Sequence, residues 1–188
     1  MNLNLPNLLT WLRILAIPLV VGVFYLPPEW LEAHAKNQVA TFLFVLAALT
    51  DWLDGWLARK LDQQSAFGAF LDPVADKLMV AAALIVLVQL QRCDGLIALI
   101  IIGREITISA LREWMAQQGQ SKSVAVNALG KIKTIVQMVA IPLLLYHDNF
   151  LGLFEASALG YWLIRAAAVL TLVSMAYYLK AALPMLRR

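Results

Sequence analysis

Apolar residues run along this chain in six long stretches that short polar connections separate. The stretches cover approximately Leu8–Leu26, Val39–Trp56, Ala69–Leu90, Leu96–Met115, Val124–Tyr146 and Ala156–Leu179. Each is close to the roughly 20 residues that a helix needs to cross the hydrocarbon core of a bilayer. None alternates in the way that a lipid-facing barrel strand does. The pattern predicts an all-α polytopic membrane protein in which residues 1–188 form a single six-transmembrane-helix bundle.

The composition agrees with a membrane protein. Of 188 residues, 62% are hydrophobic and only 14% are charged, whereas a soluble domain is about half apolar and a quarter charged. This balance argues against a soluble enzyme, a disordered chain and a nucleic-acid-binding module. The single cysteine, Cys93, excludes an intramolecular disulfide and a thiolate metal cage.

Lysine and arginine in the connections predict the orientation of the bundle. One end collects Arg59, Lys60, Arg112, Lys122, Lys180, Arg187 and Arg188, and the other end has only Lys36 and Arg92. By the positive-inside rule, both termini and the connection after Arg59 face the cytoplasm, in what we expect to be a bacterial inner membrane. A cleaved signal peptide is the alternative for the first stretch. No basic residue precedes that stretch and Arg13 lies inside it, so we expect it to be retained.

Four aspartates lie at the cytoplasmic ends of the second and third stretches: Asp51, Asp54, Asp72 and Asp76. Ionisable groups at that depth are costly unless they are paired, solvated or bound to a cation. The spacings of three and four residues place each pair on one helix face. The short polar connection between the two stretches makes the helices antiparallel neighbours. The four carboxylates are therefore expected to converge in a polar cavity that is open to the cytoplasm.

Such a cluster of carboxylates predicts bound divalent cations. Oxygen ligands without histidine or cysteine fit hard ions such as Mg²⁺ or Mn²⁺, and two such ions can polarise a phosphoryl group. Gly55 and Gly68 lie on the same helix faces and leave room for a phosphate or nucleotide. Arg59 lies on the face of Asp51 and can bind a phosphate bidentately. The structural alternative is a set of salt bridges, packing glycines and a positive-inside anchor at Arg59.

At this point the residues match a known family. The chain contains Asp51-x2-Asp54-Gly55-x2-Ala58-Arg59-x8-Gly68-x3-Asp72-x3-Asp76, which resembles the complete signature of the CDP-alcohol phosphatidyltransferases. The resemblance implies a six-helix membrane enzyme, usually a homodimer, that moves a phosphatidyl group from CDP-diacylglycerol to an alcohol and releases CMP. It implies that the four aspartates hold two divalent ions and that Asp76 is also the general base. It further implies that Gly55, Arg59 and Ser65 contact the CDP part of the donor, next to Gly68.

Two further segments carry the resemblance to one branch of that family. They are Gly103-Arg104-Glu105-Ile106 with the residues up to Ala116, and Gly130-Lys131-Ile132-Lys133-Thr134. The branch uses sn-glycerol 3-phosphate as acceptor and makes phosphatidylglycerophosphate, the precursor of phosphatidylglycerol. The N-terminal segment around Pro6 is also typical of it, and the polar face formed by Asn7, Thr10 and Arg13 is expected to contact the nucleotide.

Cations outside the signature are the candidates for binding the acceptor phosphate: Arg104, Arg112, Lys131 and Lys133. A dianionic acceptor needs such a pocket, whereas serine or plain inositol does not. Three alternatives stay open. In the first, Glu105 is the ion-pair partner of Arg104 or of another cation. In the second, Lys131 or Lys133 extends to the membrane interface instead of binding the acceptor. In the third, another alcohol such as inositol phosphate replaces glycerol 3-phosphate as the acceptor. A small cation transporter is the non-enzymatic alternative, but its acids would be spread along a path across the membrane.

Overall fold

A computed structural model describes residues 5–60, 66–117, 128–150 and 152–186. Within these ranges the side chains of a few residues are left undescribed, among them Asn7, Asp54, Gly55 and Arg59. The described chain forms six α-helices, which confirms the predicted number and helical class. They are α1 (Leu5–Gly22), α2 (Ala33–Lys60), α3 (Ala66–Gln89), α4 (Gly95–Gln117), α5 (Ala128–Tyr146) and α6 (Ala156–Leu186). A 3-10 turn, η1 (Val23–Tyr25), follows α1.

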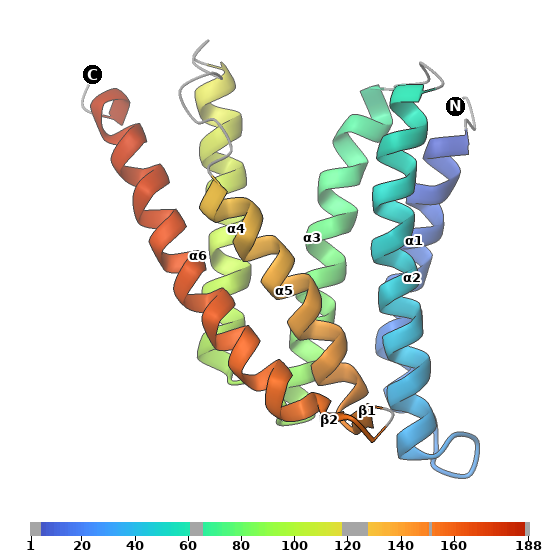
Figure 1. The fold of residues 1–188 in the computed structure, drawn as a ribbon. Coiled ribbons are helices and arrows are strands. Elements are labelled where there is room, and N and C mark those ends of the chain that lie inside the picture. The colour runs from blue at the N-terminus through green and yellow to red at the C-terminus, as the bar shows by residue number, and fades with distance from the viewer. Residues whose placement is uncertain (1–4, 61–65, 118–127, 151, 187–188) are drawn as a thin grey trace.

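The described chain agrees with the predicted all-α class and contains strands in one connection alone. Between α5 and α6 the chain forms a small antiparallel ribbon of β1 (Asn149–Phe150) and β2 (Phe154–Glu155), in which Asn149 pairs with Glu155. Strands of two residues are too short to show the alternation that predicts a strand. The ribbon caps one end of the bundle (Figure 1).

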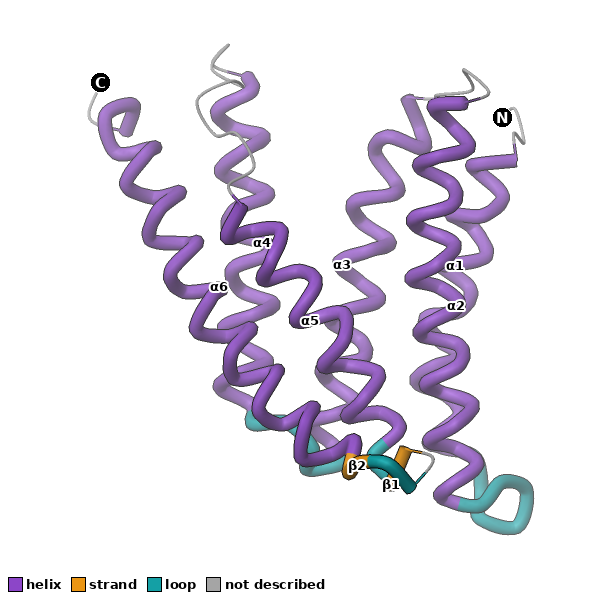
Figure 2. Tube along the Cα trace, viewed as in Figure 1, coloured by secondary structure: helices purple, strands orange, loops and turns teal. Residues whose placement is uncertain are grey.

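The helices form two groups that diverge toward one end of the molecule. In one group α1 packs along both α2 and α3, which touch each other over a shorter stretch; in the other, α6 packs along α4 and α5. Both termini lie at the open end, where the groups are farthest apart (Figures 1 and 2). At the closed end α2 contacts α5 and α3 contacts α4. The aspartate-bearing ends of α2 and α3 lie at the open end.

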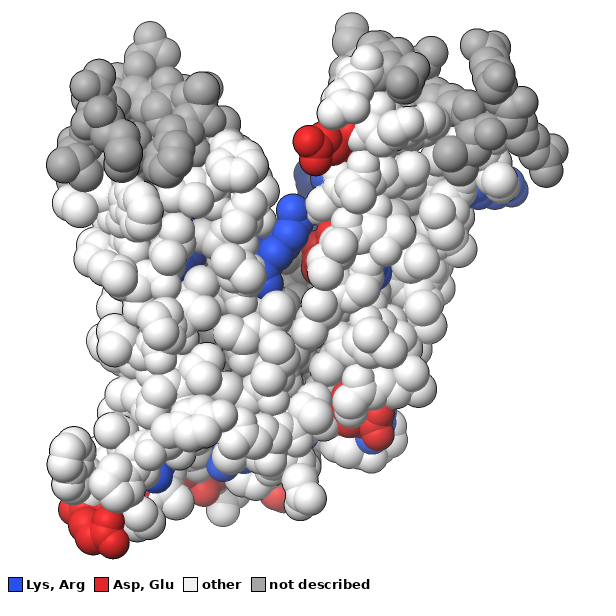
Figure 3. All heavy atoms as spheres, turned by 180° about the vertical axis from the view of Figure 1, so that it is seen from behind, with Lys and Arg blue, Asp and Glu red and all other residues white. Residues whose placement is uncertain are grey.

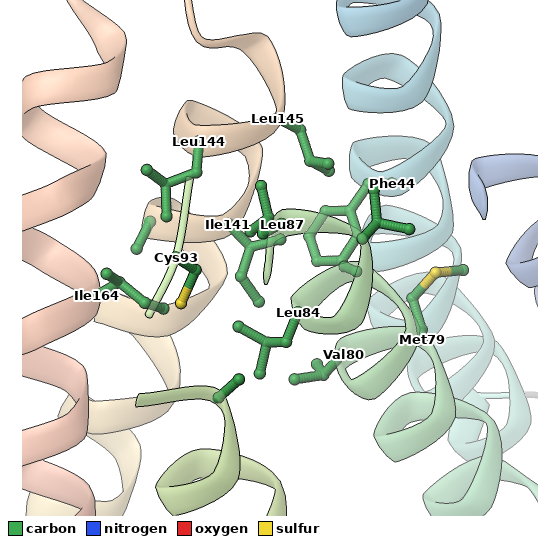
Figure 4. Packing of buried hydrophobic residues seen from close by; sticks show 14 of the residues in the cluster. Phe44, Met79, Val80, Leu84, Leu87, Cys93, Ile141, Leu144, Leu145 and Ile164 are labelled. Atoms are coloured by element: carbon green, nitrogen blue, oxygen red, sulfur yellow. The ribbon is translucent and has the colours of Figure 1, made fainter. Parts of the chain in front are cut away.

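The apolar core lies where the two groups meet. Its buried side chains come from all six helices, and Phe44 of α2, Leu84 and Leu87 of α3 and Ile141 of α5 are at most 1% exposed. Figure 4 shows these side chains pointing toward one another. Close packing of this kind makes most added or removed methylene groups costly. The apolar core therefore holds the two helix groups together at the closed end, whereas polar residues lie at the open end.

Polar contacts also tie the closed end together. Asp148, just before the ribbon, accepts hydrogen bonds from His34 at 2.8 Å and from Asn37 at 3.3 Å, both at the start of α2. Arg92, in the α3–α4 connection, donates from Nη2 to Asn37 Oδ1 at 2.9 Å and from Nη1 to the Leu145 carbonyl at 2.8 Å. The latter bond satisfies one of the carbonyls that the last turn of α5 leaves free.

Two of the described helices are long and apolar enough to cross a membrane, over Leu8–Tyr25 and Ala156–Lys180. Charged residues interrupt the apolar sequence of α3 at Asp72 and Asp76 and that of α4 at Arg104 and Glu105. Large apolar side chains nevertheless cover the outside of all six helices, with Leu15, Leu99 and Trp162 each more than half exposed. Soluble monomers rarely expose apolar surface on that scale, so the molecule is an all-helical, membrane-associated protein.

Candidate active site

Helix α1 places polar side chains against the aspartates of both neighbouring helices. Thr10 Oγ1 donates a hydrogen bond to Asp72 Oδ1 on α3 at 2.6 Å. Arg13 Nη1 lies 2.5 Å from Asp51 Oδ1 on α2. Thr10 and Arg13 are three residues apart, hence on one face of α1, and both are at most 2% exposed. Helix α1 thus fixes one carboxylate of each aspartate pair.

This arrangement gives the N-terminal polar face a role that the sequence analysis did not state. The structure turns Thr10 and Arg13 toward Asp72 and Asp51, and a buried arginine inside an apolar helix requires such an anionic partner. The Asn7 side chain lies outside the described residues. That Asn7, Thr10 and Arg13 contact the nucleotide stays a prediction.

Asp76 differs from Asp51 and Asp72 because it makes no hydrogen bond or ion pair with any residue in the described part of the chain. It lies one turn after Asp72 on α3 and is half-buried. Its carboxylate interacts repulsively with Asp51 and Glu105 and attractively with Arg13 and Lys77. Asp76 is therefore a carboxylate with free oxygen lone pairs at the centre of a charged cluster.

Asp51, Asp72 and Asp76 form what we call the carboxylate wall of the site. Its oxygen atoms are of the type that a divalent cation prefers. Among the side chains that the structure describes, no three acidic, histidine or cysteine residues converge closely enough to hold a metal ion by themselves. Asp54, the fourth aspartate of the signature, lies outside them, as do Gly55, Arg59 and Ser65. Gly68 is buried on α3. The carboxylates of Asp51, Asp72 and Asp76 are all partly exposed to the cavity side and supply only oxygen ligands, which fits a hard cation.

The opposite wall carries a buried pair of cations. Arg104 of α4 is 8% exposed and Lys133 of α5 is 1% exposed. Glu105 binds both, since its Oε1 accepts from Lys133 Nζ and lies 3.5 Å from Arg104 Nη1. The sequence left open whether Glu105 pairs with Arg104 or with another cation, and in the structure it contacts both Arg104 and Lys133. Arg104 Nη2 also donates to Ser174 Oγ of α6 at 3.3 Å, so three helices meet at this network.

The two other predicted cations differ from this pair in exposure. Arg112 is exposed, and its Nη2 donates to Tyr178 Oη at 3.2 Å. The guanidinium carbons of Arg104 and Arg112 lie 5.5 and 5.3 Å from the centre of the Tyr178 ring. Lys131 is exposed and, at two residues from Lys133, points about 200° away around α5. The structure thus joins Arg104, Arg112 and Lys133 and separates Lys131 from them.

Polar residues that sequence reasoning missed complete this wall. Ser174 and Tyr178 come from α6, and Gln137 lies one turn after Lys133 on α5; all three are at most 3% exposed. Arg104 Nε and Gln137 Oε1 are buried without a hydrogen-bond partner among the described residues. The spacing of four residues between Lys133 and Gln137 is the signal that could have found Gln137, whereas the sequence around Ser174 and Tyr178 gives no such signal.

The two walls face each other across one cleft. Lys133 interacts electrostatically with Asp76 as well as with Glu105 and Arg104. A small cavity of about 90 Å³ lies between α3 and α4 beside Lys77 and Glu105. Figure 3 shows the cleft from behind, with basic and acidic side chains in its depth and a further acidic group at its upper edge. Carboxylates on one wall and cations on the other can bind a metal-bound pyrophosphate and a second phosphate side by side.

Comparison with known proteins agrees with this geometry. Residues 3–173 match the family model described as CDP-alcohol phosphatidyltransferase. Proteins from Salmonella choleraesuis strain SC-B67 and from Escherichia coli strain K12 are each 48% identical to this chain over 97% of its length and 96% of theirs. Both are named CDP-diacylglycerol–glycerol-3-phosphate 3-phosphatidyltransferase. The match extends over both walls of the cleft and confirms the resemblance found in the sequence: the chain belongs to the CDP-alcohol phosphatidyltransferase family.

Proposed function

We propose that the protein transfers the phosphatidyl group of CDP-diacylglycerol to sn-glycerol 3-phosphate, giving phosphatidylglycerophosphate and CMP. The observation that carries this proposal is the cleft with two oppositely charged walls. The carboxylate wall suits a donor pyrophosphate bound through cations, and the Arg104–Lys133 wall suits an acceptor that carries its own phosphate. The names of the two relatives support the same donor and acceptor.

The donor side is assigned to the four aspartates and two divalent ions. Asp51, Asp54, Asp72 and Asp76 would hold Mg²⁺ or Mn²⁺, which neutralises the donor pyrophosphate and the CMP that leaves. Arg13 and Thr10 keep Asp51 and Asp72 in place from α1. The CDP part of the donor is assigned to Gly55, Arg59, Ser65 and Gly68, with Asn7 nearby.

The acceptor phosphate is assigned to Arg104 and Lys133. Both side chains are buried, and the N–H group at Arg104 Nε makes no hydrogen bond with another described residue. Charged hydrogen-bond donors in a desolvated site bind a dianion strongly. Glu105 contacts both Arg104 and Lys133 and so reduces the repulsion between their like charges. Arg112 is placed at the rim of this subsite, and Lys131 is left out of it because its side chain points elsewhere.

In the reaction, the acceptor's primary hydroxyl attacks the β-phosphorus of the donor. A bond forms between the hydroxyl oxygen and this phosphorus. The bond from the phosphorus to the oxygen that bridges the two phosphates breaks, and CMP leaves with that electron pair. Asp76 takes the hydroxyl proton, because its carboxylate is free of described partners and interacts electrostatically with Lys133 of the opposite wall.

We further propose that the six helices span a bacterial inner membrane, with the open end of the cleft and both termini facing the cytoplasm. We also propose that two copies of the chain form a homodimer. The distribution of lysine and arginine supports the orientation, and the apolar outer surface of the helices supports the span.

The test is CMP release by the purified protein in detergent with CDP-diacylglycerol and Mg²⁺. Acceptors are offered singly: sn-glycerol 3-phosphate, serine, inositol, inositol phosphate or none. We expect release only with glycerol 3-phosphate, and its loss on chelation of the metal followed by recovery with Mg²⁺ or Mn²⁺. Release with inositol phosphate instead would keep the donor and overturn the acceptor. No release with any acceptor, from folded protein, would overturn the proposed function.

A further inference from the structure

A second polar cavity lies at the closed end of the molecule, opposite the aspartates. Its volume is about 460 Å³, and it opens between the α3–α4 connection and the start of α6. Its polar lining includes Gln91, Arg92, Tyr161 and Arg165. A smaller cavity of about 230 Å³ continues from it toward the ribbon and shares Gln91, Arg92 and Tyr161. Nothing in the phosphatidyl transfer proposed above uses these residues.

Arg165 is the group in this cavity that lacks an anionic partner. Its guanidinium stacks on the Tyr161 ring, 3.2 Å from the ring centre, and Nη1 donates to the Tyr161 carbonyl at 3.3 Å. It forms no ion pair with any acid in the described ranges. An arginine stacked on an aromatic ring has its orientation fixed while its remaining N–H groups stay free to bind. Arg165 is thus held ready for an anion.

The charged residues that line the cavity indicate which kind of anion it would bind. Arg92 is partly occupied by the Leu145 carbonyl and by Asn37. Asp94 accepts a hydrogen bond at 2.7 Å from the backbone N–H of Leu96 and so caps α4. Two arginines and one aspartate line the larger cavity, a net charge of +1, while Glu155 lines the smaller cavity beside it and Asp148 interacts electrostatically with Arg92. With these acids nearby, a phosphodiester, which carries a single negative charge, fits better than a doubly charged phosphomonoester.

The surroundings of the cavity indicate that the phosphodiester belongs to a lipid. Val88, Ile97 and Ile164 form its apolar wall. On the adjoining helix surfaces Leu96, Leu99 and Val169 are each more than 60% exposed, as expected of side chains in contact with acyl chains. Tyr161 and Trp162 pack edge to face with centroids 5.6 Å apart, and such aromatic residues favour the membrane interface.

We propose that this cavity binds the phosphodiester headgroup of an anionic glycerophospholipid, in the leaflet opposite the one that faces the active site. Arg165 and Arg92 hold the phosphate, and the acyl chains lie along the exposed apolar surfaces of α4 and α6. The proposal rests on the membrane placement given under the proposed function, but not on the transfer reaction. The bound lipid would join α6 to the α3–α4 connection from the membrane side.

The test measures lipid binding and catalysis on the same preparations. Native mass spectrometry counts phosphatidylglycerol molecules that the full-length protein retains, with phosphatidylcholine as the uncharged comparison. We expect Arg165→Gln to weaken the apparent affinity for phosphatidylglycerol about tenfold and Arg165→Lys to weaken it less. Lys180→Gln, which removes an exposed charge at the other end of α6, is the matched control and should bind like the wild type.

Each other outcome overturns a stated part of the proposal. Equal retention by Arg165→Gln and the wild type would exclude the site. Equal retention of phosphatidylcholine would exclude selection by charge. Displacement of the lipid by glycerophosphoglycerol or inorganic phosphate at low concentration would show that the cavity takes a free phosphate rather than a lipid. CMP release separates this proposal from the proposed function, since lipid retention without CMP release by the wild type would overturn only the latter.

Discussion

At the scale of single residues, the site depends on charges that are held in place by other charges. Arg13 fixes Asp51 from α1, and Glu105 holds Arg104 and Lys133 together on the other wall. Buried charges persist in a protein only when such partners compensate them. Asp76, on the carboxylate wall, has no described hydrogen-bond or ion-pair partner. It therefore differs from Asp51, which Arg13 holds in place.

Replacing Asp76 with asparagine should abolish turnover while the protein still folds. The amide keeps the size of the side chain but cannot take the acceptor's proton, and a general base contributes about 10²–10⁴-fold to a rate. CMP release and the elution volume in detergent measure the two effects separately. Glu113→Gln, at an exposed acid on α4, serves as the control. Normal turnover by folded Asp76→Asn protein would remove Asp76 from the mechanism.

Lys133→Gln and Lys131→Gln form a matched pair, since they remove the same charge from the same turn of α5. A charged hydrogen bond contributes about 1.5–3 kcal/mol, so loss of Lys133 should raise the KM for glycerol 3-phosphate about 10- to 100-fold. The KM for CDP-diacylglycerol should stay the same. Lys131→Gln should leave both constants unchanged. The acceptor subsite would be misplaced if the Lys131 variant had the larger effect in these steady-state measurements.

At the scale of elements, close packing of α5 on α6 supports the cation wall. A Cβ atom on Gly160 of α6 would lie 2.9 Å from Leu144 Cγ and 3.1 Å from the Leu144 backbone nitrogen. Backbone atoms cannot move aside as a flexible side chain does, so only glycine permits this approach. Helix association inside a membrane relies on such small residues, because lipid supplies no hydrophobic force between helices.

Gly160→Ala should therefore destabilise the protein, by about 1–3 kcal/mol as in other overpacked cores. The measurement is the apparent Tm in detergent, followed by tryptophan fluorescence. Gly103→Ala is the control, because a Cβ there meets no atom within 4 Å, and its Tm should match that of the wild type. Equal Tm values for all three proteins would show that α5 and α6 adjust to the extra methyl group.

At the scale of the whole molecule, the two ends have different tasks. The apolar core and the contacts of Asp148 and Arg92 hold the closed end together. The open end separates the two helix groups and exposes the charged cleft (Figure 3).

Cysteine labelling in intact cells checks which end faces the cytoplasm. Burial raises the pKa of the native Cys93 thiol to about 11, so it reacts slowly near neutral pH, and Cys93→Ser removes it altogether. In that background we expect a membrane-impermeant maleimide to label Leu153→Cys, in the ribbon, from outside. Lys180→Cys, near the open end, should react only after the membrane is permeabilised. The reverse pattern would contradict the orientation that the basic residues predict.

The sequence by itself determined the six helices, their membrane character and the family, because hydrophobic run length and a spaced motif are local properties of the chain. It also located Asp51, Asp72 and Asp76 near one another, since helical spacing and a short connection leave few other arrangements. Only the tertiary structure paired Arg13 with Asp51, joined Lys133 to Glu105, and added Ser174 and Tyr178 from α6. Those contacts join helices that are distant in the sequence, and they depend on which helices pack together, which no local pattern encodes.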